Sequence, residues 1–206
     1  AFAKRGDELI VILKGVQEHV IGLQEVGNRF LAQSAGAQNF LPFEMGDYVA
    51  LQVELNRVKT FLDAFIPWFE SDEEHRVLVM LQNPSEIRPT GGFLGSYAEV
   101  VIRKGNVERV EVRDINDADR ALEENIVPPK PLQLIAKRWR AADANWFFDF
   151  EKSASKIASL LERSGLYEER GIQFDGVFAI TPKMISDLLL LTGPIELESG
   201  GTALDQ

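Results

Sequence analysis

The chain has 206 residues, of which 45% are hydrophobic, 26% charged and 9% aromatic, and its formal charge is −10. This composition excludes a disordered chain, and the acidic balance disfavours a nucleic-acid-binding protein, which needs a basic face for the phosphate backbone. Cysteine is absent and only two histidines are present, which excludes disulfides, thiolate metal sites, cysteine nucleophiles and multi-histidine metal sites.

Two regional features qualify this picture. The longest uninterrupted apolar runs, such as 77–81 and 188–191, are far shorter than the roughly 20 residues that cross a bilayer, so no membrane span is predicted within the chain. Between Arg88 and Arg140, ten basic residues stand against eight acidic ones, although the whole chain is acidic. This asymmetry permits either a local anion site or ordinary solvated strand and helix faces.

Residues 1–70 contain two segments in which apolar residues recur at alternating spacings of four and three, the pattern of helices with a narrow apolar seam. The predicted seams are Leu9, Leu13, Val16, Val20, Leu23, Gly27 and Phe30, and then Tyr48, Leu51, Leu55, Val58, Leu62, Phe65 and Phe69. Glycine and proline interrupt the pattern over 35–46. We therefore expect an antiparallel helical hairpin that ends near Ile66-Pro67, in which each seam buries the other.

The acidic stretch 70–74 marks a junction, after which residues 76–206 show the pattern of a mixed α/β domain. The predicted strands are 77–81, 96–102, 107–112, 174–180 and 195–197, with a turn over 103–106 whose Gly-Asn pair takes positive φ. The predicted helices are 132–141, 153–163 with Ser153 as its cap, and one that Pro182 opens and Gly193-Pro194 ends. The expected fold class is α+β, a mixed β-sheet flanked by helices and preceded by the helical hairpin.

The most unusual string is 82–96, QNPSEIRPTGGFLGS, which directly follows the first predicted strand, where α/β folds often place ligands. Gly91 and Gly92 allow the backbone to approach an anion closely, and Arg88 offers a bidentate guanidinium. The string is not a P-loop, because no Gly-Lys-Ser/Thr follows. The alternative is a tight crossover in which Arg88 pairs with Glu86 or another surface carboxylate.

The acidic string 113–119 follows the third predicted strand. It fails as an EF-hand loop because Ala118, a missing glycine and Asn125 stand at required positions. A looser divalent-metal site using Asp114 or Asp117 remains an alternative. Arg113, at the strand end, points to the sheet edge, where we expect it to converge with Arg88.

A third string, 143–150, combines Asp143 and Asn145 with the aromatics Trp146, Phe147, Phe148 and Phe150. It permits an apolar ligand groove, or aromatics that fill the core beneath a loop which Asp143 caps. His19 and His75 lie in the predicted hairpin and its linker, so no Ser/His/Asp constellation is expected.

Four strings in order, 81–96, DANW at 143–146, FDGVFAI at 174–180 and LTGPI at 191–195, resemble a bacterial and archaeal family of envelope proteins, domain of unknown function 4012. The resemblance covers about 76–206. It implies a natural chain with an upstream transmembrane helix, a helical region and this domain outside the membrane. It also implies that the domain continues past Gln206.

More distantly, the layout is similar to the LytR-CpsA-Psr family, which transfers glycopolymers from polyprenyl-pyrophosphate carriers with magnesium assistance. On that resemblance Arg88 and Arg113-Asp114 correspond to family positions that bind pyrophosphate. Asn83 and Thr90 stand where the family has magnesium-binding aspartates. An amide and a hydroxyl bring no negative charge to a hard cation, so the resemblance implies a pyrophosphate cradle more than present catalysis.

We therefore expect an extracytoplasmic, catalytically degenerate domain that binds a cell-envelope polyanion, a lipid-linked glycan or a polyprenyl phosphate, without a cofactor. Two alternatives stay open. One is a Mg²⁺-assisted glycopolymer phosphotransferase using Asp114 with Asp117 or Asp143. The other is a surface-assembly module whose hairpin makes protein contacts. The expected ligand-binding residues are Arg88, Gly91, Gly92, Arg113, Asp114, Asp143, Asn145 and Trp146.

Overall fold

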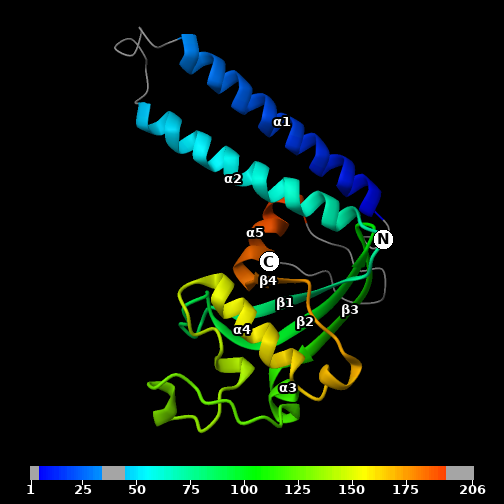
Figure 1. The fold of residues 1–206 in the computed structure, drawn as a ribbon, viewed down its shortest axis with the longest axis vertical. Helices are drawn as coiled ribbons and strands as arrows, with labels where there is room; N and C mark the ends of the chain where they lie inside the picture. Colours follow the sequence, from blue (N-terminus) through cyan, green and yellow to red (C-terminus); the bar gives the residue numbers. More distant parts are fainter. Residues whose placement is uncertain (1–4, 34–44, 194–206) are drawn as a thin grey trace. The chain divides into compact units, whose positions relative to one another are not determined.

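The computed structural model describes residues 5–33 and 45–193 (Figure 1). The chain divides into two compact units. Unit 1 comprises 1–74 with 102–108, and unit 2 comprises 75–101 with 109–206. Among the described residues, no helix combines the length and the apolar character that a membrane span requires.

Unit 1 is built on two long helices, α1 (Gly6–Gln33) and α2 (Met45–Glu70), which pack together as the predicted hairpin. The predicted end of the second helix near Ile66-Pro67 is wrong, because α2 continues to Glu70. Pro67 cannot donate a hydrogen bond to the carbonyl of residue 63, but it stands in the last turn, and the helix extends only three residues past it.

Seven of the fourteen predicted seam residues are confirmed, and the observed seam differs from the predicted one at the positions between them, where it shifts by one residue. The side chains that face the partner helix recur as Ile10, Leu13, Gln17, Val20, Gln24 and Gly27 in α1, and as Tyr48, Gln52, Leu55, Lys59, Leu62, Ile66 and Phe69 in α2. Six predicted seam residues, Leu9, Val16, Leu23, Phe30, Leu51 and Val58, are exposed instead. The residues three and four positions after a seam residue both lie on its face of the helix, so spacings of four-three and three-four fit the same shared positions, and the sequence pattern does not separate the two.

The tip of the β2–β3 hairpin belongs to unit 1. The predicted turn is present, and its positive φ values fall on Lys104 (49°) and Gly105 (69°), which confirms the prediction for Gly105 but not for Asn106. A Cβ on Gly105 would lie 2.9 Å from the Phe69 ring. The backbone N–H of Gly6 donates to Asn106 Oδ1 at 3.1 Å. Glycine is therefore suited to position 105 for two reasons. It adopts the left-handed conformation without strain, and its lack of a side chain leaves room for α1 and α2.

Unit 2 is organised around a four-stranded sheet, which is mixed, as predicted. Its strands are β1 (His75–Asn83), β2 (Phe93–Arg103), β3 (Asn106–Asp114) and β4 (Gly176–Ile180), in the order β3-β2-β1-β4. β1 and β4 are parallel, with Val77 opposite Gly176 and Leu81 opposite Ile180. Because β1 is central, its apolar run is buried on both sides, with Val77, Leu78 and Met80 all inaccessible.

Helix α4 (Phe150–Glu162) lies over one face of this sheet (Figure 1), and α3 (Ile115–Ala121), which directly follows β3, contributes to the same core. The core joins Leu78 of β1 and Tyr97 of β2 to Ile157 of α4 and to Tyr167. The cap of α4 is Asp149, which accepts from Lys152 N, and not the predicted Ser153. Ser153 instead lies inside the helix, where its hydroxyl bonds the backbone of Phe147.

The last described helix is α5 (Pro182–Thr192), in which Pro182 occupies the first turn as predicted and Thr181 is the cap. The predicted helix over 132–141 is wrong. Only the single turns Leu132–Leu134 and Ala141–Asp143 form, because backbone N–H groups bond distant acceptors, such as Trp139 N to Ile126 O at 2.6 Å. The predicted strand 195–197 lies outside the described residues.

Candidate functional site

The loop after β1 is closed on itself by short hydrogen bonds. Gln82, which is buried, donates from Nε2 to Thr90 Oγ1 at 2.8 Å, and Asn83 Oδ1 accepts from Ser85 N at 3.0 Å. Gly92 has a φ of 144°, and a Cβ there would be 2.4 Å from the carbonyl oxygen of Asn83. Gly92 is therefore required by the close backbone crossing, which is the tight crossover that the sequence offered as an alternative.

A second segment fastens this loop from the other side. Asn145 is buried, and its Nδ2 donates to the carbonyl oxygen of Gly92 at 2.7 Å. Its Oδ1 is also buried and has no hydrogen-bond partner among the described residues. A buried acceptor without a partner typically costs about 1–3 kcal/mol, and such groups concentrate where a protein has a further use for them.

The turn that carries Asp143 is held by a buried carboxylate. Asp119 accepts from the N–H groups of Ala141 (2.6 Å) and Ala142 (3.2 Å). Burial raises the pKa of Asp119 above its ordinary value of 3.8, although these two hydrogen bonds oppose the shift. Arg138 donates to the carbonyl oxygens of Leu122 and Asp119. The segment before Asp143 is thus fixed to the end of α3, although it is not a helix.

Two guanidinium groups meet at Asp143. Arg140 donates from Nε and Nη2 to Asp143 Oδ2 at 3.2 and 3.0 Å, and Arg88 Nη1 lies 3.7 Å from Asp143 Oδ1. Arg88 also donates to Glu86 Oε1 from Nε at 3.0 Å, and its guanidinium lies 5.6 Å from the centre of the Phe93 ring. The pairing of Arg88 with Glu86 was the predicted alternative, and it coexists with the contact to Asp143.

The structure therefore brings together five of the eight predicted residues. These are Arg88, Gly91, Gly92, Asp143 and Asn145. Sequence reasoning missed Arg140, which adds a second cation to the group. The available signal was its position three residues before Asp143, the spacing at which side chains on one turn can pair.

Arg113 and Asp114 make other contacts. Arg113 pairs with Glu111 on the same strand, and its buried Nε has no partner among the described residues. Asp114 is the cap of α3 and accepts from Asn116 N and Nδ2, both at 2.8 Å. These hydrogen bonds lower the pKa of Asp114 below its ordinary value. The convergence of Arg113 with Arg88 stays a prediction.

The aromatic string divides into packed and exposed members. Phe147 lies 6.3 Å from Trp139, measured between ring centres, and Trp146 is half-buried. Phe148 is 92% exposed. The core-filling alternative thus describes Phe147, whereas Phe148 stands free at the surface beside the Asp143 segment.

Metal chemistry was the alternative for the acidic residues. Within 5–33 and 45–193, no three histidine, aspartate or glutamate side chains gather as a ligand set for a metal ion. The carboxylate of Asp114 is oriented toward its own helix, and that of Asp143 toward two arginines.

A second polar cluster, which sequence reasoning did not find, lies in the core of unit 2. Glu99 on β2 is fully buried and pairs with Arg76 and, at 2.9 Å, with Arg109. Nearby, the hydroxyl of Tyr167 donates to that of Tyr97 at 2.9 Å. Burial raises the pKa of both tyrosines, so both are protonated at neutral pH. The alternation of β2 turns Tyr97 and Glu99 to the same face, which was the available signal.

Unit 2 is thus an α+β domain with a mixed four-stranded sheet. It has a loop whose close backbone crossing requires Gly92, and a site at which Arg88 and Arg140 meet Asp143. Residues 72–206 match the family described as protein of unknown function DUF4012, and the chain belongs to that family. Comparison with curated proteins and with solved structures found no match.

Proposed function

We propose that this chain is a non-catalytic, extracytoplasmic domain of the cell envelope that binds an anionic ligand, a glycan polyanion or a polyprenyl phosphate, at the Arg88–Arg140 pair. The observation that carries the proposal is the convergence of two guanidinium groups, from segments 52 residues apart, on the single carboxylate of Asp143. A site in which two arginines face one carboxylate also suits a phosphate, because a phosphate, like a carboxylate, presents pairs of oxygen acceptors to a guanidinium group.

The surroundings of the pair support this assignment. The side chain of Arg88 is partly exposed, at 23%, and that of Arg140 at 44%, so a ligand can reach both without opening the core. Asp143 itself is mostly covered. A phosphate would thus share or displace the carboxylate as partner of the guanidinium groups, in competition with it.

Three residues support the non-catalytic part of the proposal. On the resemblance to the LytR-CpsA-Psr family, Asn83 and Thr90 stand in place of metal-binding aspartates. Both side chains hold the loop, Asn83 through Ser85 N and Thr90 through Gln82. Asp114, the acid on which the phosphotransferase alternative depends, caps α3. The distant similarity to that family is part of this proposal.

The aromatic neighbours support a lipid-linked ligand. Phe148 is almost fully exposed and Trp146 is half-buried, and they lie three residues and one residue after Asn145 in the chain. An exposed aromatic close in sequence to a site with two arginines suits a ligand with an anionic head and an apolar chain. The envelope location itself is proposed from the family resemblance.

The test is calorimetric titration of the whole chain with pyrophosphate and with farnesyl pyrophosphate, as a short polyprenyl probe. We expect Arg88→Gln to weaken binding about ten-fold or more, because a charge-assisted contact contributes roughly 1.5–3 kcal/mol. Asp143→Asn should strengthen binding, since it removes the competing carboxylate. Arg163→Gln is the matched control, because Arg163 forms a surface pair with Glu124.

An equal effect of Arg88→Gln and Arg163→Gln, or weaker binding by Asp143→Asn, would contradict the proposed site. Farnesyl pyrophosphate should bind more tightly than pyrophosphate, and Phe148→Ser should abolish that difference. Transfer from a lipid-linked donor that requires Mg²⁺ and is lost in Asp114→Ala would establish the phosphotransferase alternative instead.

A further inference from the structure

The helical hairpin exposes a broad apolar surface, here called the outer apolar face. Its residues are 42–64% exposed. They are Leu9, Ile12, Val16, Leu23 and Val26 of α1, and Leu51, Val58 and Phe61 of α2.

The residues of this face follow a seven-residue repeat on both helices. Leu9, Val16 and Leu23 are seven apart, and so are Leu51 and Val58. Each of them precedes a residue of the inner seam by one position, as Leu23 precedes Gln24. The two helices are antiparallel and face each other, so a shift of one residue toward the N-terminus points to the same side of the hairpin in both. Both rows therefore lie on one side of the hairpin.

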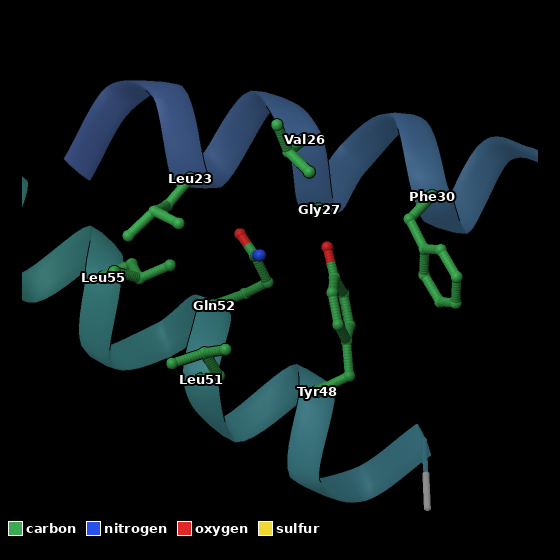
Figure 2. Close-up of a pocket in the computed structure, with 8 residues that line it drawn as sticks. All are labelled: Leu23, Val26, Gly27, Phe30, Tyr48, Leu51, Gln52 and Leu55. Atoms are coloured by element: carbon green, nitrogen blue, oxygen red, sulfur yellow. The ribbon is translucent and has the colours of Figure 1, made fainter. Parts of the chain in front are cut away.

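A shallow pocket confirms that the two rows meet. It has a volume of about 300 Å³, and its lining includes Leu23 and Val26 from α1 and Leu51 from α2 (Figure 2). Figure 2 also shows the Tyr48 hydroxyl and the Gln52 amide pointing from α2 toward α1 beneath this surface.

The polar side chains of the hairpin are not confined to its outside. The inner seam contains Gln17, Gln24, Gln52 and Lys59, whereas the rows beside it are apolar except for His19, Asp47 and Glu54. An amphipathic helix buries its apolar stripe. In α1 the more apolar stripe lies beside the contact and not in it, and in α2 the two stripes are about equally apolar.

The size of the face is that of a protein interface. Its eight side chains, each about half exposed, leave on the order of 800 Å² accessible, which exceeds the roughly 300–600 Å² of the largest patch on a typical monomer. A stable interface buries about 800 Å² from each partner.

We propose that a second copy of this chain covers the outer apolar face, so that two hairpins form a four-helix bundle. Both rows have the same seven-residue repeat in the same position relative to the inner seam, so the face is complementary to itself under a twofold rotation. Pairing two hairpins completes the core that one seam leaves half-built.

The charge of the helices opposes the rival occupant, a lipid surface. α1 and α2 together carry eight acidic and four basic residues. Helices that lie on membranes typically carry a lysine- and arginine-rich polar face that meets anionic lipid. An acidic hairpin is repelled by such a surface, whereas two copies can meet through the outer apolar face, because only Asp47 and Glu54 among the charged residues of α1 and α2 lie in its rows.

The test compares two double variants by sedimentation velocity over a range of concentrations of the full chain. Val16→Glu with Val58→Glu places two carboxylates on the outer face. Val11→Glu with Val53→Glu makes the same chemical change on the opposite side, at positions that follow the inner seam by one residue and are 69% and 46% exposed. We expect wild type and the Val11/Val53 variant to dimerise equally, and the Val16/Val58 variant to dissociate at least about 100-fold more readily, because a carboxylate is costly to bury.

A spin label gives a second readout that needs no disruptive charge. The chain has no cysteine, so Ile12→Cys and Val11→Cys each provide a single labelling site. Residue 12 lies on the outer apolar face, and residue 11 lies outside it. The label at 12 should be immobilised in the dimer and become mobile on dilution, while that at 11 stays mobile. A wild type that remains monomeric at about 100 μM, equal dissociation of the two double variants, or a monomer that binds lipid vesicles through this face would overturn the proposal.

Discussion

Gly27 of α1 lies directly against the ring end of Tyr48 on α2. A Cβ at position 27 would stand 2.4 Å from the Tyr48 hydroxyl oxygen. That hydroxyl is buried and has no hydrogen-bond partner among the described residues. The glycine therefore sets how closely the two helices approach at this level, and the tyrosine fills the space that a side chain would take.

This relationship predicts different outcomes for two glycines of one helix. Gly15 has open space around its missing side chain, so Gly15→Ala should stabilise the chain by about 0.5–1 kcal/mol through helix propensity. Gly27→Ala should gain clearly less or lose stability, because Tyr48 must move. Urea unfolding measures both, and a larger gain at Gly27 would contradict the close approach.

The observed seam predicts which side chains hold the hairpin together. Leu62 is buried in the seam, so Leu62→Ala should cost about 2–5 kcal/mol of unfolding free energy. Val53→Ala, at an exposed position of the same helix, should stay within about 0.5 kcal/mol. Leu55, which is only half-buried, should fall between them. The reverse order in chemical denaturation would contradict the burial of the seam.

The buried carboxylate of Glu99 should be among the most sensitive positions in unit 2. Glu99→Gln removes the charge of a fully buried carboxylate that pairs with both Arg76 and Arg109. Breaking a buried pair in this way typically costs about 3 kcal/mol or more. Glu124→Gln, which removes a surface pair with Arg163, should cost less than about 1 kcal/mol. Equal costs in thermal unfolding would show that the core network contributes no more than a surface pair.

Asp119 and Asp114 should have opposite effects on stability as pH changes. The folded pKa of Asp119 is raised above 3.8 by burial, so its contribution is most favourable below 3.8 and is lost as pH rises through the folded value. The folded pKa of Asp114 is lowered by the donors of Asn116, so its contribution is present above 3.8 and is lost as pH falls through the folded value.

Carbon-13 NMR of the two carboxylates checks this directly. Asp119 should titrate above 3.8 and Asp114 below it. In Asp114→Ala, the pH dependence below 3.8 should diminish while that above 3.8 is unchanged. If both carboxylates titrated at the same pH, the burial of Asp119 or the cap of α3 would be wrong.

Local patterns were enough to predict most of the elements. The hairpin, β1, the β2–β3 turn, α4, β4 and the start of α5 follow from spacing, apolar runs and glycine or proline positions. The helix over 132–141 failed because its backbone donors bond partners far along the chain. The pairing of Arg88 with Asp143, across 55 residues, has no local signal, whereas the short spacing from Arg140 to Asp143 does.

The sequence by itself determined that the chain has two helices of alternating four-three spacing, a mixed sheet and a glycine loop beside Arg88, because propensity and periodicity act between near neighbours. Tertiary structure alone decided which register of that spacing is buried, and which carboxylates the arginines meet. Gly27 and Phe69 belong to both the predicted and the observed seam, whereas either of two neighbouring residues fits the spacing at the positions between such shared residues, and only the packing of the two helices selects one. The neighbours that are not selected form much of the outer apolar face.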